Sequence, residues 1–259
     1  MKRINKELYN NLYFENSELW DNYDISGLLK EKVKFVLNYI PDDVSSIIDI
    51  GCGNGIITNQ LAERYFVMGV DASKEALSFV KTKKLHSSSA KINVDDHSFD
   101  LVFSSELLEH LPENNLVETV NEFKRINKKY IFITVPNNEM LSKTFIKCDK
   151  CNHTFHAYGH LNSFNETDIL KLIGKNYFHL KTDYFGPRIK GYNKLLLKIR
   201  HEFANRWFKA NEYSICPNCG NTEFPTKKGN ILSKFCNGLN FMISGKKYYW
   251  LFILFERIN

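Results

Sequence analysis

Hydrophobic residues along this chain follow two spacings that alternate from residue 28 onward. Apolar positions three and four residues apart predict amphipathic helices over 28–40, 56–65, 73–84, 114–126 and 165–176. Short, mostly continuous apolar runs predict buried strands over 44–50, 66–71, 99–105, 130–137, 177–185 and 246–257. Ser73 and Asn165 are the expected N-caps of two of these helices. Because strands and helices alternate, the pattern predicts an α/β fold with a doubly wound, mostly parallel sheet.

Two stretches interrupt the alternation and divide the chain into a core and insertions. We expect a lid and first helix at the N-terminus, and a cap made of two insertions, with the core between them. The expected boundaries are 1–40 for the lid and first helix, 41–136, 161–185 and 246–259 for the core, and 137–160 and 186–245 for the cap.

A basic helix is expected within the second insertion, over residues 194–213. Its apolar side, with Leu196, Ile199, Phe203 and Trp207 at helical spacing, would pack on the sheet. Alternatively, its lysines would attract a nucleotide-sugar, a lipid-linked diphosphate or a membrane surface, which makes a peripheral membrane contact one possibility.

Composition narrows the class of protein only modestly. The chain has 259 residues, 43% hydrophobic and 25% charged, which suits one large domain or a core with insertions. No apolar run has the length of a membrane span, and the N-terminus lacks an apolar signal segment, so we expect a cytoplasmic protein. The formal charge of +6 suits an anionic substrate or surface but does not require nucleic acid.

Three glycines, Gly51, Gly53 and Gly55, lie between the first predicted core strand and the helix after it. A glycine-rich turn of this kind lets backbone N–H groups at a helix N-terminus approach a nucleotide closely. A phosphate-binding P-loop would require a lysine that is absent here, and a dinucleotide fingerprint would place its third glycine one residue later.

The segment "DIGCGNG" (Asp49–Gly55) resembles motif I, D-x-G-x-G-x-G, of the class I S-adenosylmethionine-dependent methyltransferases. Its context agrees, because Asp71 ends the second strand and "INVDDHSFDLVFSSELLEHL" is similar to the family segment around the fourth strand. The resemblance covers roughly residues 35–185 and the last strand, and it is to the small-molecule (type 11-like) branch. It implies a seven-stranded sheet in the order 3-2-1-4-5-7-6, with strand 7 antiparallel, and S-adenosylmethionine as cofactor.

The resemblance also implies which residues bind the cofactor. Asp71 would accept hydrogen bonds from both ribose hydroxyls, and Asp49 would either lie near the methionine amine or cap the glycine loop. The family's acidic adenine ligand is absent, so the backbone around 88–90 would replace it. Trp20 and Tyr23 would close over the cofactor or pack on the core. The implied cofactor-binding set is Asp49, Gly51, Cys52, Gly53, Gly55, Asp71, Ala72, Ser88, Ser89 and Ser104.

Two C-x-x-C pairs, Cys148/Cys151 and Cys216/Cys219, are typical of zinc knuckles, and together they supply four thiolates for a tetrahedral structural zinc. Alternatives are a site in which His153 or His156 replaces one cysteine, and cysteines that are redox-active or bind no metal. The implied sheet order brings both insertions to the carboxyl edge of the sheet, where a zinc ion would join them into one cap. Cys236 remains unassigned.

Tyr158 and His160 follow the first knuckle and would border the acceptor cavity. His160 is the first candidate for a catalytic base, because histidine titrates near neutrality. The alternative is that His160 supports the helix beginning at Asn165. His110 corresponds to a family position that is usually structural.

These features favour a methyltransferase acting on a small or medium acceptor, with a sugar or glycan precursor as one candidate. One alternative is an RNA methyltransferase that uses the zinc cap to hold nucleic acid, although the dispersed charge makes nucleic acid a less favoured partner. The other is a non-catalytic, zinc-stabilised module that binds S-adenosylmethionine.

Overall fold

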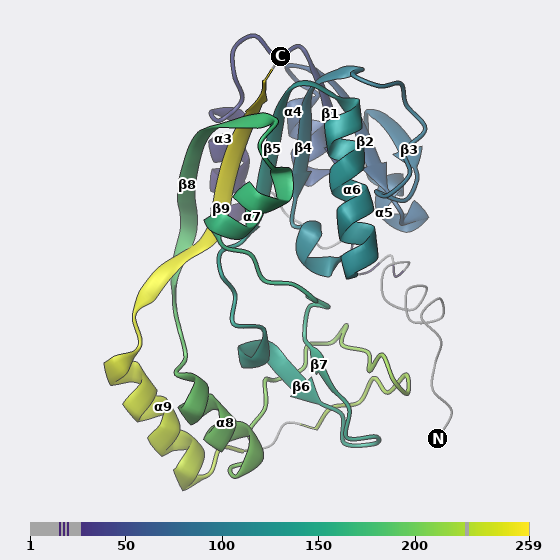
Figure 1. The fold of residues 1–259 in the computed structure, drawn as a ribbon. Coiled ribbons are helices and arrows are strands. Elements are labelled where there is room, and N and C mark those ends of the chain that lie inside the picture. Colours follow the sequence, from purple (N-terminus) through teal and green to yellow (C-terminus); the bar gives the residue numbers. More distant parts are fainter. Residues whose placement is uncertain (1–15, 17, 19, 21–26, 226–227, 259) are drawn as a thin grey trace.

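The computed structural model describes residues 16, 18, 20, 27–225 and 228–258, and Figure 1 shows their arrangement. Seven strands form one sheet in the order β3-β2-β1-β4-β5-β9-β8. The strands are β1 (Ser46–Ile50), β2 (Phe66–Asp71), β3 (Lys83–His86), β4 (Phe99–Ser105), β5 (Asn127–Pro136), β8 (Tyr177–Lys190) and β9 (Lys246–Arg257).

The first five strands of the sheet are parallel, and β9 runs antiparallel to both of its neighbours, β5 and β8. Two short strands, β6 (Phe145–Lys147) and β7 (Thr154–His156), form a separate antiparallel ribbon. The strand labels therefore differ from the expected 3-2-1-4-5-7-6, which did not include this ribbon. The strand that ends the described chain lies between β5 and β8.

Helices cover both faces of the sheet, which is the doubly wound arrangement (Figure 1). Helices α6 and α7 contribute to the apolar cluster on one face, and α3 and α4 to the cluster on the other. Helices α8 and α9 lie away from the sheet, at the far end of β8 and β9 (Figure 1). The helices are α3 (Gly27–Leu37), α4 (Ile56–Leu61), α5 (Lys74–Ser78), α6 (Glu113–Ile126), α7 (Glu166–Ile173), α8 (Lys194–Glu202) and α9 (Ile231–Ile243), with 3-10 turns η1 (Leu108–His110) and η2 (Leu141–Thr144).

The apolar run of β1 is continuous because both faces of this strand are buried. Ile47 packs in the cluster beneath α3 and α4, and Ile48 and Ile50 pack in the cluster beneath α6 and α7. Asp100, near the start of β4, connects this strand to the start of β1. Its Oδ2 accepts hydrogen bonds from the backbone N–H and hydroxyl groups of Ser45 and Ser46. These hydrogen bonds fix the register of β1 against β4 at the amino ends of the two strands.

Both predicted N-caps are confirmed. The Ser73 hydroxyl accepts a hydrogen bond from the Ala76 amide at 3.0 Å. Asn165 and Asp168 form a reciprocal capping box at the start of α7.

Most of the predicted helices end a few residues early, and two are less than half as long as their apolar spacing suggested. The segment 73–84 is helical only to Ser78, because Lys83–His86 pairs with β2 as the edge strand of the sheet. The predicted helix over 194–213 is wrong beyond Glu202. It ends there because Asn205 adopts a left-handed conformation with φ of 46°, which stops a helix.

The two insertions meet in space, as the sequence predicted. Apolar side chains from the ribbon and from residues 208–224 form a third hydrophobic cluster, separate from the two beside the sheet. The Phe208 amide also donates to the Phe145 carbonyl at 2.9 Å. No helix among the described residues has the length and apolar content required to cross a membrane.

Candidate functional site

The glycine turn after β1 depends on glycine both for conformation and for space. Gly51, Gly53 and Gly55 have φ of 78°, 54° and 75°, the left-handed region that side chains disfavour. A Cβ on Gly51 would lie 2.9 Å from the Leu107 side chain, and one on Gly55 would lie 2.8 Å from that of Val80. Leu107 and Val80 thus leave no room for side chains at Gly51 and Gly55, and α4 begins directly after the turn.

Asp71 connects the end of β2 to this turn. Its Oδ2 accepts the Gly53 amide at 2.8 Å, and its Oδ1 accepts the Ser73 amide at 2.9 Å. Each carboxylate oxygen can accept a further hydrogen bond, so the group remains able to hold a diol. The structure thus places Asp71 beside the glycines, as the resemblance implied.

Asp49 is fully buried beneath the turn. Its Oδ2 accepts the Thr58 hydroxyl at 2.7 Å, whereas its Oδ1 has no hydrogen-bond partner among the described residues. Burial raises the pKa of Asp49 to about 7, with the Thr58 hydrogen bond opposing the shift. A buried carboxylate oxygen without a donor fits an ammonium group of a bound ligand.

The other expected cofactor residues lie around the same edge of the sheet but differ in their contacts. Cys52 is largely buried, with its Sγ packed toward Gly69. The Ala72 carbonyl accepts a hydrogen bond from the His86 ring at 3.0 Å. Ser88 is exposed in the loop after β3, whereas the Ser89 hydroxyl bonds to that of Thr119 on α6 at 2.8 Å.

Ser104 is buried in β4, and its hydroxyl donates to the Ile50 carbonyl at 2.9 Å. This bond gives Ser104 a part in joining β4 to the end of β1.

Trp20 lies over the glycine turn. Its carbonyl accepts a hydrogen bond from Asn54 at 2.8 Å, and its ring would be 3.2 Å from a Cβ on Gly53. Trp20 thus covers Gly53, whereas Tyr23 lies outside the described residues.

A cluster of charged and imidazole side chains follows β4 and β5 at the same edge. Glu106 pairs with the buried Lys32 of α3 at 3.3 Å. Burial, reinforced by Glu106, raises the pKa of Glu109 well above its usual range, and neither Glu109 carboxylate oxygen has a described hydrogen-bond partner. The Glu109 backbone carbonyl accepts the amides of Leu161 and Asn162, which holds the two loops together.

His160 is at the centre of this cluster, held by Glu139. Glu139 Oε2 lies 2.5 Å from His160 Nδ1, and its Oε1 lies 3.2 Å from His156 Nε2. Although burial opposes it, hydrogen bonding to the two histidines lowers the pKa of Glu139 to about 2. The ionised Glu139 fixes the His160 proton on Nδ1, which leaves Nε2 able to accept a proton.

His156 connects this cluster to the ribbon. Its Nδ1 accepts the amides of Tyr158 and His160, so its proton is on Nε2, which faces Glu139 and Thr144. Because His156 belongs to β7, the position of the ribbon determines the position of His160. The helix at Asn165 is capped by Asp168 instead, and no hydrogen bond joins His160 to it in the described structure.

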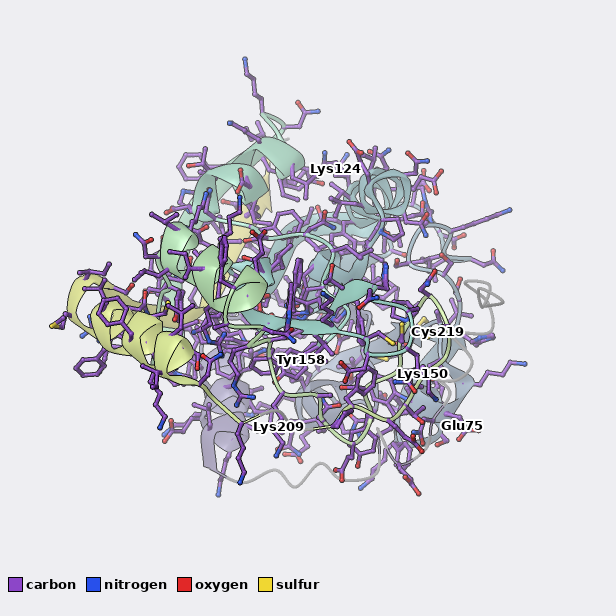
Figure 2. The ribbon with its side chains drawn as sticks, turned by 90° about the horizontal axis from the view of Figure 1, so that it is seen from below. Glu75, Lys124, Lys150, Tyr158, Lys209 and Cys219 are labelled. Carbon is purple, nitrogen blue, oxygen red and sulfur yellow. The ribbon has the colours of Figure 1, made fainter. Side chains whose placement is uncertain are left out.

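Tyr158 and His110 flank His160. Tyr158 is partly exposed, with its ring 6.2 Å from the His160 ring centroid (labelled in Figure 2). The His110 ring meets that of His160 edge-on at 4.7 Å. Burial lowers the pKa of His110 to about 3, so His110 is neutral at physiological pH.

Among the described residues, three groups of side chains have ligand atoms close enough to hold a metal ion. One consists of Cys148, Cys151, Cys216 and Cys219, and the others are Glu109/His110/His160 and Glu139/His156/His160. His160 belongs to both of the latter groups, so an ion bound by either group would use a nitrogen of the His160 ring.

The four cysteines come from both insertions and are all free thiols. The Sγ atoms of Cys148 and Cys219 are 3.6 Å apart, as are those of Cys151 and Cys216. A tetrahedron with Zn–S bonds of about 2.3 Å has S–S edges of about 3.8 Å, so the spacing fits this geometry. Neither His153 nor His156 belongs to the cysteine group. Cys219 is labelled in Figure 2.

Sequence reasoning missed Glu139, Glu109, Glu106 and Lys32. The signal available was the position of acidic residues directly after two predicted strands, in "SSELLEH" and "VPNNE". Lys32 gave no signal, because it lies within the first predicted helix and its contacts with Glu106 and Trp250 arise only in the folded chain.

Residues 48–132 match the family model described as a methyltransferase domain. Curated relatives include ubiquinone biosynthesis O-methyltransferases from Neisseria meningitidis (34% identical, 26% of this chain and 34% of the relative) and Hydrogenovibrio crunogenus (26% identical, 41% and 48%). The match thus spans only a third to a half of these relatives. An uncharacterised protein of Methanocaldococcus jannaschii, MJ0638, is 27% identical over 66% of this chain and 77% of its own.

Solved structures share the fold over most of the chain. A methyltransferase from Archaeoglobus fulgidus aligns with a TM-score of 0.52 at 16% identity, covering 97% of this chain and 99% of that one. The magnesium protoporphyrin IX methyltransferase of Synechocystis with bound S-adenosylmethionine aligns with a TM-score of 0.54 at 12% identity, covering 98% of each. Residues 48–132 are thus similar to a methyltransferase domain, and the solved structures share the fold of this chain.

Proposed function

We propose that this protein transfers the methyl group of S-adenosylmethionine to a hydroxyl of a small or medium acceptor, with a sugar or glycan precursor as the first candidate. The observation that carries this proposal is the buried Glu139–His160 pair, which lies at the same edge of the sheet as the glycine turn and would supply a base for a hydroxyl. The curated relatives named as O-methyltransferases also favour an oxygen acceptor.

The proposed cofactor site consists of the glycine turn, Asp49 and Asp71. Asp71 would hold the ribose hydroxyls, and the partnerless Oδ1 of Asp49 would pair with the methionine ammonium. The bound sulfonium supplies an electrophilic methyl group, and the loop 88–90 would contact the adenine. Trp20 would cover the bound molecule.

In the proposed reaction, the acceptor oxygen bonds to the methyl carbon as the carbon–sulfur bond breaks, leaving S-adenosylhomocysteine. The hydroxyl proton passes to His160 Nε2, and Glu139 stabilises the resulting imidazolium. Tyr158 would border the acceptor. Methyl transfer also requires alignment and the exclusion of water, which the closed cap would provide.

We also propose that the four cysteines bind one structural zinc ion. Its four ligands would be thiolates, and a filled tetrahedron leaves no position for substrate, so the ion would not take part in the chemistry. In this arrangement residues 137–160 and 186–245 form one cap above the core. In this proposal the lid and first helix are residues 1–40, and the core is 41–136, 161–185 and 246–259.

The experiment that tests the function is methyl transfer from radiolabelled S-adenosylmethionine to fractionated cell extract, followed by purification of the labelled acceptor. With that acceptor, His160→Ala should lower kcat about 10²- to 10⁴-fold while leaving S-adenosylhomocysteine binding unchanged. His179→Ala is the matched control, because His179 lies on β8, outside the cluster around His160. Near-normal turnover in His160→Ala would refute the base, and loss of turnover on removal of a divalent ion other than zinc would assign the histidines to that ion.

RNA is the alternative acceptor, favoured by the basic residues of the second insertion. Labelling that appears in RNA, with salt-sensitive binding, would select this acceptor. Absence of transfer to any fraction, with S-adenosylhomocysteine still bound, would indicate a non-catalytic module.

A further inference from the structure

Helix α9 has the reverse of the burial pattern of an ordinary surface helix. Its buried positions are Ser233, Cys236 and Asn240, which are small or polar. Its large apolar side chains are exposed instead, with Ile231 at 87%, Met242 at 74% and Phe241 at 71% exposure. The remaining exposed apolar residues of the helix are Leu232, Phe235 and Ile243. A monomeric surface helix normally places such residues against the core.

Polar contacts hold α9 in this orientation. The Asn240 side chain accepts the Asn193 amide at 2.8 Å and donates to the Gly191 carbonyl at 3.1 Å, which ties α9 to the start of α8. At the other end, the Asn230 side chain caps α9 and donates to the Ala204 carbonyl. Rotation that buried the apolar side would break these bonds.

Helix α8 also carries exposed apolar side chains. Helices α8 and α9 lie side by side at the end of the molecule away from the sheet (Figure 1), and side chains project outward from α9 at the periphery (Figure 2). Leu195 and Phe203, at the two ends of α8, are exposed like the apolar residues of α9.

The apolar surface lies in the most basic part of the chain. Residues 186–247 contain twelve of the 35 lysines and arginines but only three of the 29 acidic residues. This segment is therefore net +9, whereas the remaining sequence is net −3. The Lys190 ammonium lies 3.4 Å from the centroid of the Phe241 ring, and Lys234 and Lys246 are exposed nearby in sequence.

We propose that the α8–α9 hairpin docks the protein on an anionic lipid surface, with α9 lying in the plane of the membrane interface. Apolar side chains would enter the boundary between headgroups and acyl chains, and the lysines around them would pair with lipid phosphates. The charge favours this partner over a second copy of the chain, because self-association through this region would bring two strongly basic surfaces together. The proposal does not depend on the methyl acceptor.

The test is flotation of the full chain with vesicles of phosphatidylcholine, with or without about one third phosphatidylglycerol. Binding is expected to the anionic vesicles and to weaken in high salt. Ile231→Ser/Met242→Ser should lower it at least tenfold, as should Lys234→Glu/Lys246→Glu. The matched control is Phe66→Ser/Val117→Ser, which removes two exposed apolar residues from other parts of the surface.

S-adenosylhomocysteine binding and circular dichroism establish that each variant is folded. Absence of wild-type binding to anionic vesicles overturns the proposal, as does equal loss in the control pair. A wild-type dimer in light scattering that Ile231→Ser/Met242→Ser converts to monomer, without any vesicle binding, would assign the surface to a second copy instead.

Discussion

Two carboxylates beside the glycine turn illustrate how the surroundings of a residue determine its behaviour. Asp71 is partly exposed and accepts two backbone amides, whereas Asp49 is buried with one oxygen unpartnered. The sequence identified both residues through the resemblance, but only the structure distinguishes them, because burial of Asp49 arises from packing of strands distant in sequence.

Asp49 should make cofactor binding depend on pH. Its raised pKa, about 7, means that it is increasingly protonated below neutrality, whereas an ammonium ligand requires the ionised form. Affinity for S-adenosylhomocysteine, measured by calorimetry, should therefore fall by up to about tenfold per pH unit below 7. Asp49→Asn should remove this dependence, and Asp71→Ala should weaken binding at every pH. A flat profile in the wild type would contradict the assignment of Asp49.

Gly53 should be intolerant of any side chain. Gly53→Val forces a β-branched residue to φ of 54° and places its Cβ 3.2 Å from the Trp20 ring, so S-adenosylhomocysteine binding should fall at least tenfold. Gly174→Val is the matched control, because Gly174 also has a positive φ but has open space around it. Both variants should lose stability in thermal unfolding, but only Gly53→Val should lose binding.

Glu139 should act as a positioning residue for His160. Glu139→Gln keeps the shape of the side chain but removes the charge that stabilises a protonated His160, so kcat should fall about tenfold or more with KM little changed. The pH at which activity declines should also move, which a purely structural role would not cause. Unchanged kinetics in Glu139→Gln would separate this pair from catalysis.

At the scale of elements, apolar spacing predicted the buried strands of the core well, but it failed where contacts between segments distant in sequence decide the structure. The buried strands were evident because both faces are covered, so their apolar runs are continuous. The helix after Ser73 was overextended because pairing of Lys83–His86 with β2 prevailed over helical propensity. Helix α8 was overextended because nothing in its apolar spacing signals the left-handed Asn205.

The candidate site was predictable only where a local motif carries it. The glycine turn, Asp71 and the cysteine pairs have characteristic spacing, whereas the Glu139–His160 contact joins two loops through the fold. The meeting of the two cysteine pairs followed from sheet order, which the resemblance implied and spacing alone did not.

The contact between the ribbon (β6 and β7) and the second insertion should depend on one metal ion. The purified protein should contain about one zinc per chain, and Cys148→Ser and Cys216→Ser should each lose it, because each removes a ligand of the same tetrahedron. Cys236→Ser is the control, since that buried thiol lies on α9, outside the group. Two zinc ions per chain, or metal retained after losing either pair, would contradict a shared site.

At the scale of the whole molecule, the proposed donor and acceptor halves of the site lie on different parts of the fold. The glycine turn, Asp49 and Asp71 belong to the sheet, whereas His156 belongs to the ribbon beside the cysteines. Chelation should therefore loosen the cap and abolish acceptor turnover while S-adenosylhomocysteine binding largely survives. Calorimetry and turnover measured on the same chelated sample would check this, and parallel loss of both would contradict the division.

The hydrogen bond from the Gly191 amide to the Gly245 carbonyl, 3.0 Å long, closes the base of the second insertion. Because β8 and β9 are antiparallel neighbours there, the polypeptide leaves and re-enters the sheet at a single point. Residues 192–244 therefore leave the sheet and return to it between the same two neighbouring strands. Replacing them by a tight turn, or by an unrelated segment, would leave the order of the strands unchanged. Exchange of this segment would therefore alter the proposed cap and the proposed lipid-docking helices, while the glycine turn and Asp71, which lie outside it, would be retained.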